Sequence, residues 1–207
     1  MLKKRFFILL PQLFITLLVP ILSSCVTTAS VNKESSAFSS GHISRNLTDR
    51  GIKSSESLQK FFLSNNPNAD KDMVKRMADY YIEESRTEGI NSDCAFVQMC
   101  LETGFLKFGG LVTPDMHNYC GLGSMDAQHP GERFETEQMG VRAHIQHLHA
   151  YATSESIPLK NPCIDTRYRY VTPRGKSPSI YNLTGTWAMD REYSVKINIL
   201  LNKLEAF

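Results

Sequence analysis

Apolar side chains recur every three or four residues in separate segments between residues 56 and 207, and this repeat constrains the fold more than any other feature of the sequence. Such spacing places side chains along one face of an α-helix. Glycine, proline and asparagine separate the segments, as is typical of helix ends and turns. The pattern predicts a mainly α (α+β) domain in which helices pack through their apolar faces. The expected helices cover about 58–65, 70–88, 92–102, 137–152 and 190–204.

Local signals mark the ends of these helices. Gly89 is the expected C-cap of the second helix, because glycine readily takes the left-handed conformation that ends helices. Ser92 is the expected N-cap of the third helix, and Asp190 the start of the last. The glycines between residues 109 and 123 predict loops with at most a short β-hairpin.

The first 24 residues are expected to be a secretory signal peptide. Three basic residues precede an apolar stretch over 6–22, which is the usual order in such signals. A transmembrane anchor is the weaker alternative, because two prolines interrupt the stretch and a span normally needs about 20 apolar residues.

Residues 22–25, Leu-Ser-Ser-Cys, resemble the lipobox of bacterial lipoproteins. That resemblance implies cleavage before Cys25 and lipid modification of its side chain. More than one acyl chain gives stable membrane binding, so the mature protein is expected to be held at a membrane of the cell envelope without spanning it.

Residues 25–55 are expected to form the lipidated cysteine and a flexible tether, since eight of residues 26–55 are serine and few are large and apolar. Residues 56–207 are then expected to form one folded domain. Outside the cytoplasm, cysteines can form disulfides. We expect either burial of the cysteines as small apolar side chains or one bridge involving Cys120 or Cys163.

Charge and spacing exclude two classes of function. The formal net charge is +2, and removal of the three basic leader residues leaves −1, so nucleic acid is not an expected partner. His144, His147 and His149 lack the four-residue step and glutamate of an HExxH zinc site. They are interpreted as solvent-facing histidines, and neither a metal nor a cofactor is expected.

Glu102 is the strongest candidate for chemistry. It follows Ala95 by seven residues and Met99 by three, which places it on their core-facing stripe. Desolvation there, and the negative end of the helix dipole, both disfavour the ionised carboxylate. The sequence therefore predicts a carboxyl that stays protonated near neutral pH, as a general acid requires.

Four stretches in order resemble bacterial glucosaminidases, glycoside hydrolase family 73. They are 95–108 (AFVQMCLETGFLKF), 118–123 (NYCGLG), 140–148 (GVRAHIQHL) and 185–190 (GTWAMD). The resemblance extends over about 56–207. It implies a lysozyme-like domain with two lobes, a groove for peptidoglycan glycan strands, and hydrolysis of the β-1,4 bond between N-acetylglucosamine and N-acetylmuramic acid. Glu102 matches the family's proton donor, and Tyr193 resembles its active-site tyrosine.

The sequence leaves the second catalytic group open. Some family members place a second acid on a hairpin after the Asn-x-x-Gly turn, and Asp126 is the first candidate here. The alternative is a substrate-assisted route through the sugar's own acetamido group. Sugar faces stack on aromatic rings. The expected substrate-binding residues are Gln98, Asn118, Tyr119 and Trp187.

Two other functions compete with this interpretation. A lytic transglycosylase has a similar fold with a single essential glutamate, and it leaves 1,6-anhydro ends. A non-catalytic wall-binding lipoprotein would keep the groove and lack turnover.

Overall fold

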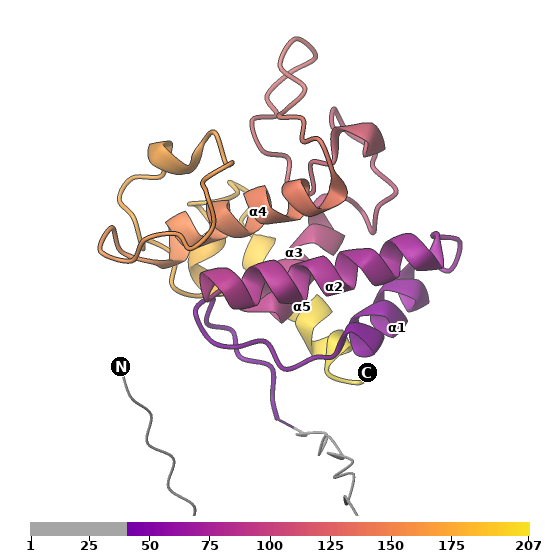
Figure 1. Ribbon diagram of the computed structural model, residues 1–207. Coiled ribbons are helices and arrows are strands. Elements are labelled where there is room, and N and C mark those ends of the chain that lie inside the picture. Colours follow the sequence, from indigo (N-terminus) through magenta and orange to yellow (C-terminus); the bar gives the residue numbers. More distant parts are fainter. Residues whose placement is uncertain (1–40) are drawn as a thin grey trace, which may run out of the picture. The chain divides into compact units, whose positions relative to one another are not determined.

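The computed structural model describes residues 41–207, and within them helices account for nearly all regular structure (Figure 1). The mainly α prediction is confirmed for this part of the chain. Its β-bridges are isolated pairs, such as the one between Asp126 and His129, in agreement with the expectation of loops with at most a short hairpin. The helices are α1 (Ser55–Asn65), α2 (Lys71–Glu88), α3 (Ser92–Glu102), α4 (Glu137–Ala152) and α5 (Tyr193–Leu204), with short 3₁₀ turns at Pro114–Met116, Tyr168–Tyr170 and Ile180–Leu183.

Helix α3 lies at the centre of this arrangement. Every residue from Ser92 to Cys100 is buried, as expected of a helix that is covered on all sides. Helix α2 packs against α1, α3 and α4, and α3 packs against α5. Figure 1 shows the two long helices α2 and α4 side by side. The central position of α3 fixes the orientation of the residues at its C-terminal end.

The predicted ends of α2 are confirmed, and two other predicted ends need correction. Gly89 has a left-handed φ of 72° and caps α2. Asn91, not Ser92, is the N-cap of α3, because its side-chain oxygen accepts the backbone N–H groups of Asp93 and Cys94. The last helix begins at Tyr193, three residues after Asp190.

The predicted tether of residues 25–55 extended too far into the chain. Ile43 is fully buried and Leu47 is 1% exposed, and both belong to the main core. Arg45 donates to Glu205 at 2.7 Å, near the end of α5. Residues 43–47 are therefore part of the folded domain, because two apolar residues in a polar stretch are enough to anchor it.

The expected signal peptide and Cys25 lie outside the described residues. Within 41–207, no helix has both the length and the apolar character of a membrane span.

All four cysteines of the described domain are free thiols. Cys94, Cys100 and Cys120 are buried, in agreement with the first of the two expected arrangements, and Cys163 is exposed. The alternative of a bridge involving Cys120 or Cys163 was wrong for this structure.

Candidate active site

Glu102 is the last residue of α3, and the turn that follows holds it in place. The backbone N–H of Phe105 donates to the carbonyl of Cys100 at 2.7 Å, and that of Gly104 donates to Leu101 at 3.3 Å. This pair of bonds is a Schellman motif, which needs a left-handed residue after the helix. Gly104 supplies it with a φ of 59°. The sequence therefore ends the helix at Glu102 by a specific backbone device.

One oxygen of the Glu102 carboxyl receives both of its hydrogen bonds. The indole N–H of Trp187 donates to Oε1 at 3.0 Å, and the hydroxyl of Tyr193 donates to the same atom in a very short bond. Among the hydrogen bonds of residues 41–207, none reaches Oε2. The two oxygens are therefore inequivalent, and Oε2 is the one free to carry a proton toward a ligand.

The surroundings of Glu102 favour its neutral form. Desolvation by the protein atoms around it raises the pKa of the carboxyl, and the bonds from Tyr193 and Trp187 oppose part of that rise. The expected position on a buried stripe was wrong, because Glu102 is solvent-exposed as a residue while Ala95 and Met99 are fully buried. The acid is thus both accessible and partly desolvated, which suits a proton donor.

Behind the acid, a line of buried polar side chains runs into the core. Gln98 Nε2 donates to the Tyr193 hydroxyl at 2.9 Å, and its Oε1 lies 3.1 Å from His144 Nε2. The Tyr81 hydroxyl lies 2.8 Å from His144 Nδ1. Burial lowers the pKa of His144 to about 3, so the imidazole is neutral. These contacts join α2, α3, α4 and α5 at the acid.

The interpretation of the three histidines as solvent-facing was wrong. His144 and His149 are fully buried, and His147 pairs with the buried carboxylate of Asp165 at 2.7 Å. The sequence contained a signal for His144, which shares an apolar helix face with Val141 and the following stripe residues. In the described part of the chain, no three His, Cys, Asp or Glu side chains are grouped as metal ligands.

Trp187 lies among three other aromatic or imidazole rings of α4. Its ring centroid is 5.8 Å from that of His144, 5.2 Å from His147 and 5.1 Å from Tyr151. These contacts fix the indole so that its N–H points at Glu102. The structure therefore brings one predicted substrate-binding residue directly to the acid.

Three other predicted substrate contacts are buried and need correction. Gln98 and Asn118 are each 1% exposed, and Tyr119 is fully buried. Asn118 holds the 118–123 turn by donating to the carbonyls of Leu122 and Glu132 at 2.9 and 3.0 Å. In this structure the polar or aromatic groups of all three residues are therefore enclosed by the domain.

Asp126 lies in the exposed turn that follows. Its Oδ1 accepts the backbone N–H groups of Gln128 and His129 at 3.0 and 2.9 Å, and it lies 2.9 Å from the His129 ring. The bond with His129 lowers the pKa of the Asp126 carboxyl, so it is ionised. Its hydrogen bonds stay within the turn, and the structure does not join it to Glu102.

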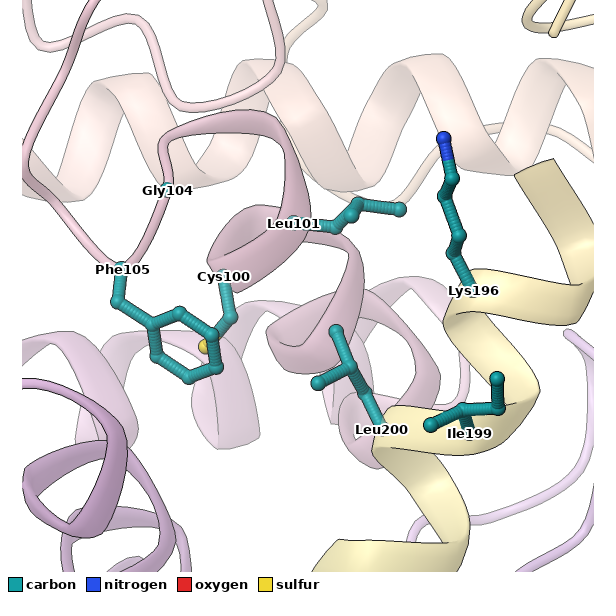
Figure 2. Close-up of a pocket in the computed structure, with 7 residues that line it drawn as sticks. All are labelled: Cys100, Leu101, Gly104, Phe105, Lys196, Ile199 and Leu200. Carbon is teal, nitrogen blue, oxygen red and sulfur yellow. The ribbon is translucent and has the colours of Figure 1, made fainter. Parts of the chain in front are cut away.

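An apolar pocket of about 280 Å³ lies on another side of the α3 terminus, between it and α5 (Figure 2). None of its residues was predicted to bind sugar, and only Lys196 among them carries a charge. It is lined by Cys100, Leu101, Gly104, Phe105, Lys196, Ile199 and Leu200.

Several known proteins are similar to this chain. The model of the Glucosaminidase family, described as mannosyl-glycoprotein endo-beta-N-acetylglucosaminidase, matches residues 78–206. An uncharacterized protein of Borreliella burgdorferi is 44% identical over 160 residues, which are 77% of this chain and 77% of that protein. S. aureus autolysin E, solved in complex with the muropeptide NAM-L-ALA-D-iGLU, is similar with a TM-score of 0.49 and 12% identity, over 78% of this chain and 71% of its own. The family match includes Glu102 and every side chain that contacts it.

Proposed function

This chain belongs to the glucosaminidase family of glycoside hydrolases, and on that premise we propose that it hydrolyses peptidoglycan at the β-1,4 bond between N-acetylglucosamine and N-acetylmuramic acid. The observation that carries the proposal is the Glu102 carboxyl, with a raised pKa and both hydrogen bonds on Oε1. A carboxylic acid held in this way can donate its proton from the free oxygen to a glycosidic oxygen.

The reaction begins with proton donation from Oε2 of Glu102 to the leaving oxygen as the glycosidic bond breaks. The carboxylate that forms is stabilised by Trp187 and Tyr193, which already donate to Oε1. Because the protonated form is the active one, the rate falls as the pH rises through the raised pKa of Glu102.

The second step needs a group that attacks the anomeric carbon or activates water. Asp126 is ionised, as a base must be, and the loop that carries it would have to bring it to the sugar. The acetamido oxygen of the substrate is the alternative nucleophile. Both routes leave a hydrolysed product with a reducing N-acetylglucosamine end.

The chemical identity of the product ends shows which glycosidic bond is cleaved. Purified peptidoglycan digested with the full chain and reduced with borohydride should contain N-acetylglucosaminitol. Anhydro-muramic ends alone would place the protein with lytic transglycosylases, and an undigested wall would make it a binding protein.

The role of Glu102 is tested by Glu102→Gln, which keeps the shape of the side chain and removes the proton. A general acid contributes about 10²- to 10⁴-fold in rate, so wall hydrolysis should fall at least about a hundredfold. Glu83→Gln on the exposed face of α2 is the matched control and should keep full activity. A folded Glu102→Gln protein with wild-type turnover contradicts the mechanism.

We also propose that the protein acts from the cell envelope, anchored to a membrane through lipid on Cys25. The proposal rests on the lipobox resemblance of residues 22–25. Cys25→Ser should abolish labelling by a fatty-acid analogue and release the protein from the membrane fraction. Cys163→Ser, at an exposed thiol of the domain, should change neither. Labelling that survives in Cys25→Ser would refute the anchor.

A further inference from the structure

The polar groups behind the acid are all buried, which makes their arrangement specific. Tyr81 and His144 are fully buried, Gln98 is 1% exposed, and Tyr193 is 5% exposed. A polar group inside a protein is costly unless it is hydrogen-bonded; here Gln98, His144 and Tyr193 have partners on both sides, and Tyr81 ends the chain of bonds at His144. A fully satisfied chain of this kind permits few alternative arrangements.

The chemistry of the groups sets the direction of every bond in the chain. The carbonyl oxygen of Gln98 can only accept, so His144 Nε2 must carry the hydrogen that it receives. The other ring nitrogen of neutral His144 is then an acceptor, and the Tyr81 hydroxyl must donate to it. The amide N–H of Gln98 points the other way and donates to the oxygen of Tyr193.

This direction determines what Tyr193 can do for the acid. Its oxygen is occupied as an acceptor, so its own hydrogen is free to bond to Glu102 Oε1. A reversed Gln98 amide would present a carbonyl oxygen to Tyr193, and the tyrosine hydrogen would then be drawn away from Glu102. With its hydrogen on Nε2, His144 opposes that reversal, because its N–H would face the amide N–H of Gln98. The reversal would also require the hydrogen to move to Nδ1 and the Tyr81 hydroxyl to turn and accept it.

We propose that His144 is a positioning residue for the reaction: through Gln98, it holds Tyr193 as a donor to Glu102 Oε1. This proposal rests on the proposed role of Glu102 as the general acid. It accounts for a histidine without a proton to exchange at working pH, enclosed in the core next to a catalytic carboxyl.

The proposal predicts a difference between two substitutions of similar size. His144→Phe fills the volume but removes the donor to Gln98, so Gln98 and Tyr193 lose their fixed direction. His144→Gln can place an amide N–H toward Gln98 and should restore much of the function. Replacement of Tyr81 by Phe removes only the outermost donor, and a smaller effect is expected.

The assay is kcat and KM on purified peptidoglycan as a function of pH, with the full chain. For His144→Phe we expect kcat to fall about ten- to a hundredfold with KM within about twofold, since one hydrogen bond to a charged group is lost at the acid. The alkaline limb of kcat/KM should move to higher pH, because the Glu102 anion loses a donor that lowers its pKa.

The titratable groups around Glu102 do not change charge in a way that would alter the pH profile of one variant relative to another. Burial raises the pKa of Tyr193, Cys120 and Tyr81 and lowers that of His144, so all four stay neutral through the range of the assay. His147, which contacts the indole beside the acid, is present in every variant and contributes equally to each.

A direct measurement keeps the proposal separate from enzymatic activity. The Glu102 carboxyl can be titrated by carbon-13 NMR in protein labelled at glutamate Cδ, with Glu102→Gln identifying its signal. Its pKa should be higher in His144→Phe than in wild type and near wild type in His144→Gln. If wild type does not hydrolyse peptidoglycan, the proposed function fails while this titration still tests the positioning role.

Two outcomes would overturn the proposal. One is a folded His144→Phe protein with wild-type kcat and an unmoved Glu102 titration. The other is a loss in His144→Gln equal to that in His144→Phe at equal thermal stability, which would mean that His144 matters for packing alone. If His144→Phe does not fold, the same titration of Tyr81→Phe tests the proposal. An unchanged Glu102 pKa in that variant then counts against a role for this line of hydrogen bonds.

Discussion

The ion pair between Arg142 of α4 and Glu84 of α2 provides the sharpest test of what holds the scaffold of the site together. Arg142 donates to both carboxylate oxygens, from Nε and Nη2, at 2.9 Å each. The Glu84 side chain is only 2% exposed, and that of Arg142 is 26% exposed. Arg142→Met keeps the apolar stem and removes the charge, which leaves the carboxylate buried without its cation.

The size of the effect follows from that burial. Removal of one partner from a buried ion pair costs about 3–5 kcal/mol of unfolding free energy, because an unpaired charge is left inside the protein. Two amide donors remain on Glu84, from Gln138 at 2.9 Å and Asn161 at 3.2 Å. These donors and the partial exposure of Arg142 favour the lower limit of that free-energy range. We expect a loss of about 3 kcal/mol, or about 6–12 °C in the unfolding temperature of a domain of this size.

The chain offers a matched control in Arg76, which also joins α2 to α4. Arg76 bonds to Glu137 in the same two-pronged geometry at 2.8 and 2.9 Å, but its side chain is 46% exposed. Exposed pairs contribute about 0–1 kcal/mol, so Arg76→Met should cost little. Urea unfolding followed by far-ultraviolet circular dichroism measures both variants. Glu84→Gln combined with Arg142→Met should recover much of the loss, since no charge is then stranded. Equal losses in the two arginine variants would refute the reasoning from burial.

Three further predictions concern the site and its support. Trp187→Phe removes a donor from Glu102 Oε1, so kcat should fall about tenfold or more and the alkaline limb of the activity profile should move to higher pH. Tyr151→Phe, beside the indole, should change neither quantity. Rates measured over a series of pH values test both variants. Asp126→Asn separates the two routes: a loss of about a hundredfold or more in wall hydrolysis indicates a catalytic base, and near-normal turnover favours the substrate's acetamido group. Gly140→Ala should lower the thermal midpoint of unfolding markedly, because a methyl group there would lie 1.7 Å from a backbone carbonyl oxygen. A midpoint within 1–2 °C of wild type, which is on the order of the shift expected for a surface substitution, would contradict this prediction.

The helices and the place of Glu102 at a helix end were predictable because their signals are local. The apolar repeat gives α4 its bounds at residues 137 and 152, and Gly89 ends α2 where its backbone freedom is needed. Glu102 could be placed at the end of α3 for the same reason, since Gly104 follows at the position that a Schellman turn requires.

The roles of the supporting residues depend on partners from distant parts of the sequence, and they were not predictable in the same way. Gln98 and His144 are 46 residues apart, and no local pattern shows that their side chains meet. Ile43 joins the core from a serine-rich stretch because the rest of the domain offers it an apolar surface. A helix pattern shows which face turns inward, but not which polar groups will meet there.

Trp187 is the sole tryptophan of the chain, and its indole N–H is bonded to the proposed acid. The molecule's tryptophan emission therefore arises entirely at the proposed active site. Ionisation of Glu102 places a negative charge 3.0 Å from the indole nitrogen, and a sugar bound at the proposed site would displace water from the same surface. A pH titration or a glycan titration of unlabelled protein can thus be followed by its intrinsic fluorescence, with Glu102→Gln as the variant in which the first signal disappears and the second is retained.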